Sequence, residues 1–141
     1  MIKRHASAEW QKGIKSGKGV VKTESKVLDH NYSFNQRFED GKGTNPEELL
    51  GASHASCFSM ALSGGLERAG FAPESISTEE TIHLEKKGDG FIIPQIDIET
   101  TAKVPGIDEA TFKQEAEKAK DNCPISLALK GVKFNLNAKL K

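Results

Sequence analysis

The sequence has no excess of charge of either sign, only two cysteines and no long apolar run. Lys and Arg together number 20, as do Asp and Glu, so the formal net charge of the 141-residue chain is zero. Nucleic acids and anionic membranes are held mainly by Lys and Arg, which makes a neutral chain a poor candidate for either partner. Two cysteines cannot form the framework of a disulfide-dense secreted protein, and they are too few for a zinc cluster.

The chain shows neither a targeting signal nor a membrane span. Its first ten residues, MIKRHASAEW, carry charge with no apolar run behind them, unlike a signal peptide. The longest apolar stretch of helical character, around 49–66, is interrupted by Ser, His and Gly. With 36% hydrophobic and 28% charged residues, the composition is typical of one soluble globular domain over residues 1–141. We therefore expect a cytoplasmic protein whose thiols are kept reduced.

Two hydrophobic periods alternate along the chain and predict an α+β fold. Alternation in period two is typical of strands, and spacings of three and four are typical of helices. Their order predicts antiparallel β-sheets packed around two main helices. The expected strands are 2–10, 20–27, 32–38, 76–87, 91–104 and 132–140, and the expected helices are 46–69, 108–123 and 125–130.

The first of these helices has a well-marked start. Asn45 suits the N-cap, Pro46 the first helical position and Glu48 the third position of a capping box, which leaves Glu47 for another partner. The residues that follow are apolar or small nearly all round, and such a helix is expected to be buried. In the strand 91–104, Pro94 indicates an edge or a bulge.

The two cysteines lie in the two main helices. Cys57 is inside the first helix, and Cys123 ends the second, directly before Pro124. Both could be buried structural thiols, because free cysteine is among the most buried residue types. His54 and Cys57 lie three residues apart on one helix face and could instead bind a metal ion or act as a cysteine hydrolase pair. That pair offers only two metal ligands, and no orienting acid or oxyanion hole is evident beside it.

Four segments together carry a family resemblance. They are GTNPEELL (43–50), HASCFSMA (54–61), NCPIS (122–126) and FNQRF (34–38). In combination they resemble the OsmC/Ohr family of cysteine-based hydroperoxide reductases, and more closely its OsmC branch, almost from end to end. The resemblance implies that Cys57 is the peroxidatic cysteine and Cys123 the resolving one. It implies that Arg37 contacts the reactive sulfur and that Glu47 holds Arg37.

The same resemblance implies the assembly and the reactants. Members fold as an intertwined homodimer with active sites at the subunit interface, use no metal or organic cofactor, and are reduced by dithiols. The expected reaction is the reduction of organic hydroperoxides, with hydrogen peroxide a slower substrate. We expect the pocket around Cys57 to be apolar, with Phe38, Leu50, Phe58 and Met60 as candidate walls, which would suit hydroperoxides that carry an organic group. A thiol–disulfide sensor or binding protein that switches without turnover is the alternative from another class.

Helix geometry adds a constraint on this site. Glu47 and Cys57 are ten residues apart, which is about 15 Å along a helix, so the carboxylate cannot touch the sulfur of its own helix. Either Arg37 spans the gap or Glu47 reaches the site from a second subunit. We expect a composite site, with Cys57 and Cys123 from one chain and Arg37 and Glu47 at least partly from the other.

Overall fold

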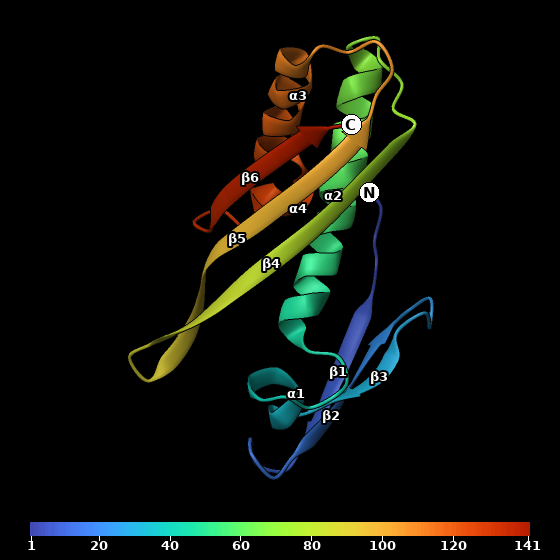
Figure 1. Ribbon diagram of the computed structural model, residues 1–141. Coiled ribbons are helices and arrows are strands. Elements are labelled where there is room, and N and C mark those ends of the chain that lie inside the picture. Colours follow the sequence, from blue (N-terminus) through green and yellow to red (C-terminus); the bar gives the residue numbers. More distant parts are fainter. The chain divides into compact units, whose positions relative to one another are not determined.

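The computed structural model describes all 141 residues and divides the chain into two compact units, Met1–Leu49 and Leu50–Lys141 (Figure 1). The first unit contains an antiparallel sheet in the order β1-β2-β3. Its strands are β1 (Ala6–Gln11), β2 (Lys18–Thr23) and β3 (Asp29–Tyr32). The expected strands 2–10 and 20–27 are therefore both present, but each is shorter than the sequence pattern indicated.

The expected strand 32–38 is wrong, because most of that segment is the short helix α1 (Phe34–Phe38). The hydroxyl oxygen of Ser33 accepts a hydrogen bond from the Gln36 N–H and caps the helix at its start. Phe34 and Phe38 stack with ring centroids 4.9 Å apart, and their spacing of four residues suits a helix rather than a strand. Arg37 consequently lies in the last turn of α1.

The second unit is built on a three-stranded sheet in the order β4-β5-β6. Strand β4 (Ser75–Lys87) pairs with β5 (Gly90–Lys103) in antiparallel fashion, as expected for a hairpin. Strand β6 (Lys133–Leu140) pairs with β5 in parallel, so the sheet is mixed and not antiparallel throughout. The physical reason is the connection between them, because two helices carry the chain back to the starting end of β5.

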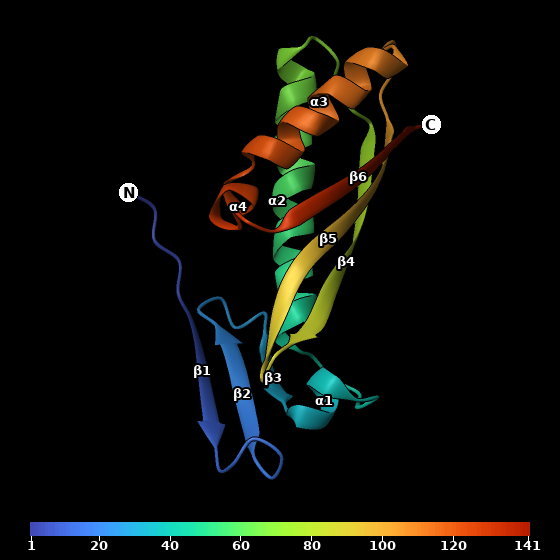
Figure 2. The ribbon, with the colours of Figure 1, turned by 90° about the vertical axis from the view of Figure 1, so that its left-hand side faces the viewer.

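Three helices complete this unit. Helix α2 (Pro46–Arg68) begins in the first unit and continues through the second, while α3 (Glu109–Asn122) and α4 (Pro124–Ala128) connect β5 to β6. Figures 1 and 2 show α2 and α3 on the same face of the sheet. The α+β class expected from the sequence is confirmed. No helix is long and apolar enough to cross a membrane.

The core of the second unit lies between this sheet and the two long helices. Ile96, Ile98 and Ala102 alternate along β5 and are fully buried. Helix α2 buries one stripe and leaves Met60 77% exposed, so within the chain it is not buried on every side. Its buried residues are Gly51, His54, Phe58, Leu62, Gly65 and Leu66.

Two local features explain how the elements meet. A Cβ atom on Gly65 would lie 2.9 Å from a carboxylate oxygen of Glu115, so a small residue lets α3 approach α2 closely here. The expected irregularity at Pro94 is confirmed, because the β4–β5 register shifts between His83 and Glu85, opposite this part of β5. Pairing with β6 begins only at Gln95, one residue later.

Candidate active site

The two cysteines, far apart in the sequence, meet in the second unit. Cys57 is partly buried on α2, and Cys123 is 1% exposed at the junction of α3 and α4. Both are free thiols, and they lie near enough for each side chain to shift the pKa of the other. The backbone N–H of Ile125, at the start of α4, lowers the pKa of Cys57. The structure therefore places two thiols side by side, as a disulfide between them would require.

Local sequence explains the position of Cys123. Pro124 cannot continue α3, because it lacks the N–H that a helix interior needs, and it instead occupies the first position of α4. Cys123 then acts as the N-cap of α4, and its sulfur accepts a hydrogen bond from the Ser126 N–H at 3.3 Å. The Ser126 hydroxyl lies 3.1 Å from the same sulfur. The Ser126 N–H is thus a donor aimed at this sulfur, and the Ser126 hydroxyl can either donate to it or accept from it.

Arg37 and Glu47 form an ion pair within the first unit. The Nη2 of Arg37 donates to Oε1 of Glu47 at 2.7 Å, and its Nε lies 3.1 and 3.2 Å from the two carboxylate oxygens. The guanidinium also lies over the Phe38 ring, 5.0 Å from its centroid. Asn45 accepts the Glu48 N–H at 2.8 Å as a helix cap, which leaves the Glu47 side chain for Arg37. Nη1 of Arg37 makes no hydrogen bond within the chain.

A buried hydrogen-bonded chain leads from the sheet to Cys123. His54 is fully buried, its Nδ1 lies 2.8 Å from Oε2 of Glu80, and its Nε2 lies 2.8 Å from Oγ of Ser126. The Glu80 side chain is 1% exposed, and its other oxygen, Oε1, has no hydrogen-bond partner. Ser126 joins this chain to the sulfur of Cys123.

Sequence reasoning missed Glu80 and Ser126, and assigned His54 only to a metal or hydrolase pair. Both ring nitrogens of His54 are engaged by Glu80 and Ser126, so His54 is not available to Cys57 as a metal ligand or a base. One signal was present in the sequence. Glu80 occupies an inward position of β4, between Thr78 and Ile82 in the period-two pattern, where a charged residue needs a buried partner.

The two thiols differ in acidity. Burial raises the pKa of Cys57, and its hydrogen bond with Cys123 and the negative charges around it raise the pKa further, against the N–H of Ile125. Burial also raises the pKa of Cys123, but hydrogen bonds from Ser126 and Cys57 and the charge of His54 outweigh it, so that pKa is lowered.

His54 is shifted toward its charged form. Burial lowers the pKa of this imidazole, but the hydrogen bond and the charge of Glu80, helped by Cys123, outweigh burial, and the pKa is raised. An imidazolium beside Cys123 in turn favours the thiolate there. The acidity of Cys123 and the basicity of His54 thus have the same structural origin.

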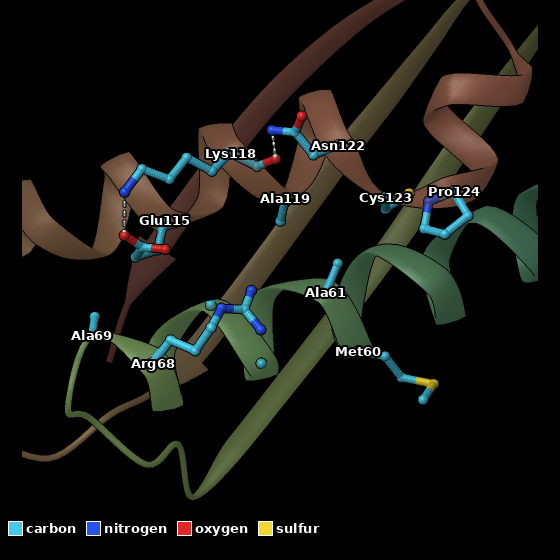
Figure 3. A pocket seen from close by; sticks show the side chains of 12 residues that line it. Met60, Ala61, Arg68, Ala69, Glu115, Lys118, Ala119, Asn122, Cys123 and Pro124 are labelled. Carbon is cyan, nitrogen blue, oxygen red and sulfur yellow. Dashed lines mark hydrogen bonds and ion pairs between the residues drawn. The ribbon is translucent and has the colours of Figure 1, made fainter.

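A groove of about 630 Å³ runs between α2 and α3 and reaches Cys123 and Pro124 at one end (Figure 3). Met60 contributes to its wall, but Cys57, around which the pocket was expected, does not line it. Phe58 is fully buried in the core and Leu50 packs against that core, and neither lines this groove. Phe38 belongs to the first unit and stacks there on Phe34.

Comparison with known proteins gives one family. A family model described as OsmC-like protein matches residues 39–137. Peroxiredoxin OsmC of Escherichia coli is 50% identical over 99% of this chain and 98% of its own, and an organic hydroperoxide resistance protein of Xanthomonas axonopodis is 31% identical over 90% and 86%. A crystal structure of an organic hydroperoxide resistance protein OsmC from Legionella pneumophila superposes with a TM-score of 0.72 at 23% identity, covering 96% of both chains. The chain belongs to the OsmC-like protein family.

Proposed function

We propose that this protein is a cysteine-based peroxidase that reduces organic hydroperoxides, and hydrogen peroxide more slowly. The observation that carries the proposal is the meeting of Cys57 and Cys123 as free thiols that shift each other's pKa. The printed names of the relatives, peroxiredoxin and organic hydroperoxide resistance protein, support the same chemistry. The reaction protects the cell against oxidative stress and needs no metal or organic cofactor.

Access decides the roles of the two thiols. Cys57 is only partly buried, whereas Cys123 is 1% exposed. A peroxide must reach the attacking sulfur, so Cys57 is the peroxidatic cysteine and Cys123 the resolving cysteine. The oxidised Cys57 is then formed beside the thiol that resolves it.

The cycle follows established sulfur chemistry. The Cys57 thiolate attacks the O–O bond, becomes a sulfenic acid and releases the alcohol. Cys123 condenses with the sulfenic acid to form a disulfide and water, which protects Cys57 from irreversible oxidation. A dithiol reductant then restores both thiols by exchange.

Arg37 is the group that favours the thiolate form of Cys57 in this proposal. The pKa of Cys57 is raised there, yet the nucleophile must be a thiolate. A guanidinium against the sulfur favours that thiolate, and its remaining N–H groups donate to the peroxide oxygens. Full ionisation gains only about thirtyfold in rate, or about 2 kcal/mol, over an ordinary cysteine at neutral pH. Stabilising the departing oxygen must therefore provide most of the acceleration.

The ion pair with Glu47 suits this task. Glu47 engages Nε and Nη2 of Arg37 and so fixes the plane of the guanidinium, while Nη1 keeps its donors for sulfur or peroxide. We place this pair at the thiols of a second subunit, in a homodimer with its sites at the interface. The ten-residue separation of Glu47 and Cys57 on α2 supports this arrangement.

The proposal also covers the compartment and the domain organisation of the protein. Two free thiols that cycle through a disulfide need a reducing compartment, which favours the cytoplasm. We treat residues 1–141 as one OsmC-like domain, because the Escherichia coli relative aligns over 99% of the chain.

A dithiol-coupled assay tests the proposal. Protein well below the peroxide concentration is supplied with excess dithiol and either an alkyl hydroperoxide or hydrogen peroxide. Repeated turnover, faster with the alkyl hydroperoxide, is the expected result. Consumption of a single equivalent would instead identify a redox sensor or binding protein, and no consumption would overturn both readings.

A further inference from the structure

We propose that Glu80, His54 and Ser126 form a buried proton relay that takes the proton of Cys123 when it attacks and returns it when the disulfide is reduced. The proposal rests on the resolving role of Cys123 proposed above. Ser126 touches the reacting sulfur and is a catalytic residue, while His54 and Glu80 act through it.

The geometry allows the chain of hydrogen bonds to reverse without moving a heavy atom. With Cys123 protonated, its S–H donates to Ser126, the Ser126 hydroxyl donates to Nε2 of His54, and Nδ1–H donates to Glu80. With Cys123 ionised, Nε2–H donates to Ser126 and Ser126 donates to the thiolate. Every donor and acceptor along the path is satisfied in both states, and one proton has moved from sulfur to imidazole.

The surroundings of His54 favour the charged state. Glu80 faces it from β4, Ser126 and Cys123 from the α3–α4 junction, and the uncharged Phe134 ring from β6 at 5.0 Å. A buried carboxylate is costly unless it is paired with positive charge, and Oε1 of Glu80 has no other partner. The imidazolium is therefore the group that compensates Glu80.

The relay gives a balanced resolving step. The Cys123 proton passes to Ser126 while the Ser126 proton passes to His54. The thiolate attacks the sulfenic sulfur of Cys57, and the S–S bond forms as the S–O bond breaks. The departing oxygen takes up a proton from the solvent buffer and leaves as water, and the buffer regains a proton when the dithiol ionises to attack the disulfide. His54 holds its proton while the disulfide exists.

Reduction runs the relay backwards. A thiolate of the dithiol attacks the more accessible sulfur of Cys57, and the electron pair of the S–S bond leaves with Cys123. The Cys123 thiolate regains its proton from His54 through Ser126. The second thiol of the reductant then attacks the mixed disulfide and frees Cys57. A stabilised thiolate leaves faster, so the relay serves both halves of the cycle.

Titration of Cys123 tests the relay without any catalysis. In a Cys57→Ser background, ultraviolet absorbance of the thiolate is followed against pH. Ser126→Ala and Glu80→Gln should each move the Cys123 transition to higher pH. Ser59→Ala is the matched control. It removes from α2 a hydroxyl that hydrogen-bonds to Thr78 of β4, outside the relay, and it should not change the pH of the Cys123 transition. Unchanged transitions in both relay variants would overturn the proposal.

Stopped-flow kinetics with cumene hydroperoxide tests the use of the relay. Ser126→Ala should slow disulfide formation roughly three- to thirtyfold near neutral pH and change sulfenic acid formation much less, the lower figure allowing for the stronger nucleophilicity of a more basic thiolate. The deficit should vanish above about pH 10, where an ordinary thiol ionises unaided. Equal slowing of both steps at every pH would mean a structural role and overturn the relay. Failure of the parent protein to form sulfenic acid would overturn the proposed function, while the titration still decides the relay.

Discussion

The two halves of the proposed site are built in opposite ways. Cys57 and Cys123 sit among buried partners, and the network behind Cys123 is closed to solvent from Glu80 to Ser126. Arg37 and Glu47 instead form a pair whose arginine side chain is 36% exposed. The acidity of Cys123 is therefore set by partners in its own unit, whereas Arg37 keeps the donors of Nη1 unused. In the proposed mechanism the first half carries the covalent chemistry and the second stabilises charge that develops during it.

Replacing the nucleophile should have the largest effect. Cys57→Ser should abolish peroxide consumption in the coupled assay, because no other accessible thiol lies at the site. Cys123→Ser should consume one equivalent and then lose activity as Cys57 is over-oxidised, which mass spectrometry detects as a sulfinic acid. Sustained turnover by Cys57→Ser would refute the division of roles.

Removing the cation should come next. Arg37→Gln deletes the charge and the donors, and we expect a roughly hundred- to thousandfold loss of kcat/KM. Arg37→Lys should recover only part of it, because a lysine cannot make the paired hydrogen bonds of a guanidinium. The dependence of kcat/KM on pH should shift to higher pH in Arg37→Gln. An unaltered pH profile would show that Arg37 does not act on the thiolate.

Mixing two inactive variants tests whether the Cys57 and Arg37 of one active site come from the same chain or from two chains. Cys57→Ser and Arg37→Gln chains are unfolded together, refolded and assayed. Recovery of activity is expected if Arg37 serves the thiols of a second subunit, because each mixed dimer then holds one intact site. Absence of recovery, with exchange verified by native mass spectrometry, would place both halves of each site in the same chain.

Replacing Glu80 should have a smaller effect, which is seen in the pH dependence of the free energy of unfolding. The pKa of folded His54 lies above its usual 6.5, so its charged form stabilises the fold below about pH 6.5, and this contribution is lost as pH rises through the raised pKa. Glu80→Gln should therefore lower the free energy of unfolding by about 1–3 kcal/mol at low pH and by less at high pH. Urea denaturation at several pH values measures this. A loss that does not change with pH would contradict the charged pair.

The smallest effect is expected for His83 and Asp97, a second histidine–carboxylate pair, which lies on the exposed face of the same sheet. The hydrogen bond from His83, with those from Asn135 and Gln95, holds the pKa of Asp97 below its usual range. His83 is 44% exposed, so water replaces the lost contact. His83→Gln should leave both the unfolding midpoint and kcat/KM close to those of the parent. A marked loss of activity would show that the sheet surface contributes to the site.

The sequence predicted the regular elements well where one hydrophobic period ran for many residues. The strands 76–87 and 91–104 and the helices that start at 46 and near 108 are present within one or two residues of their expected bounds. The segment 32–38 failed because its period-two pattern competes with a Ser33 cap and a Phe34–Phe38 stack at helical spacing. The parallel partner of β5 could not be read locally, because strand direction depends on the crossover helices.

The site was predictable only in part. A family resemblance named Cys57, Cys123, Arg37 and Glu47, and the structure brings them together as two pairs in two units. The relay behind Cys123 was out of reach, because its hydrogen bonds join α2 to β4 and to α4 across 26 and 72 residues of sequence. Only the inward placement of a glutamate in β4 pointed to a buried partner.

The most direct test of the thiol pair is a single oxidation without reductant. Reduced protein is given one equivalent of an alkyl hydroperoxide, and its peptides are mapped by mass spectrometry after alkylation of free thiols. The expected result is one alcohol per chain and a disulfide between Cys57 and Cys123 of the same chain. Unmodified Cys57, or a disulfide linking two chains, would contradict the assignment of these residues as nucleophile and resolving thiol.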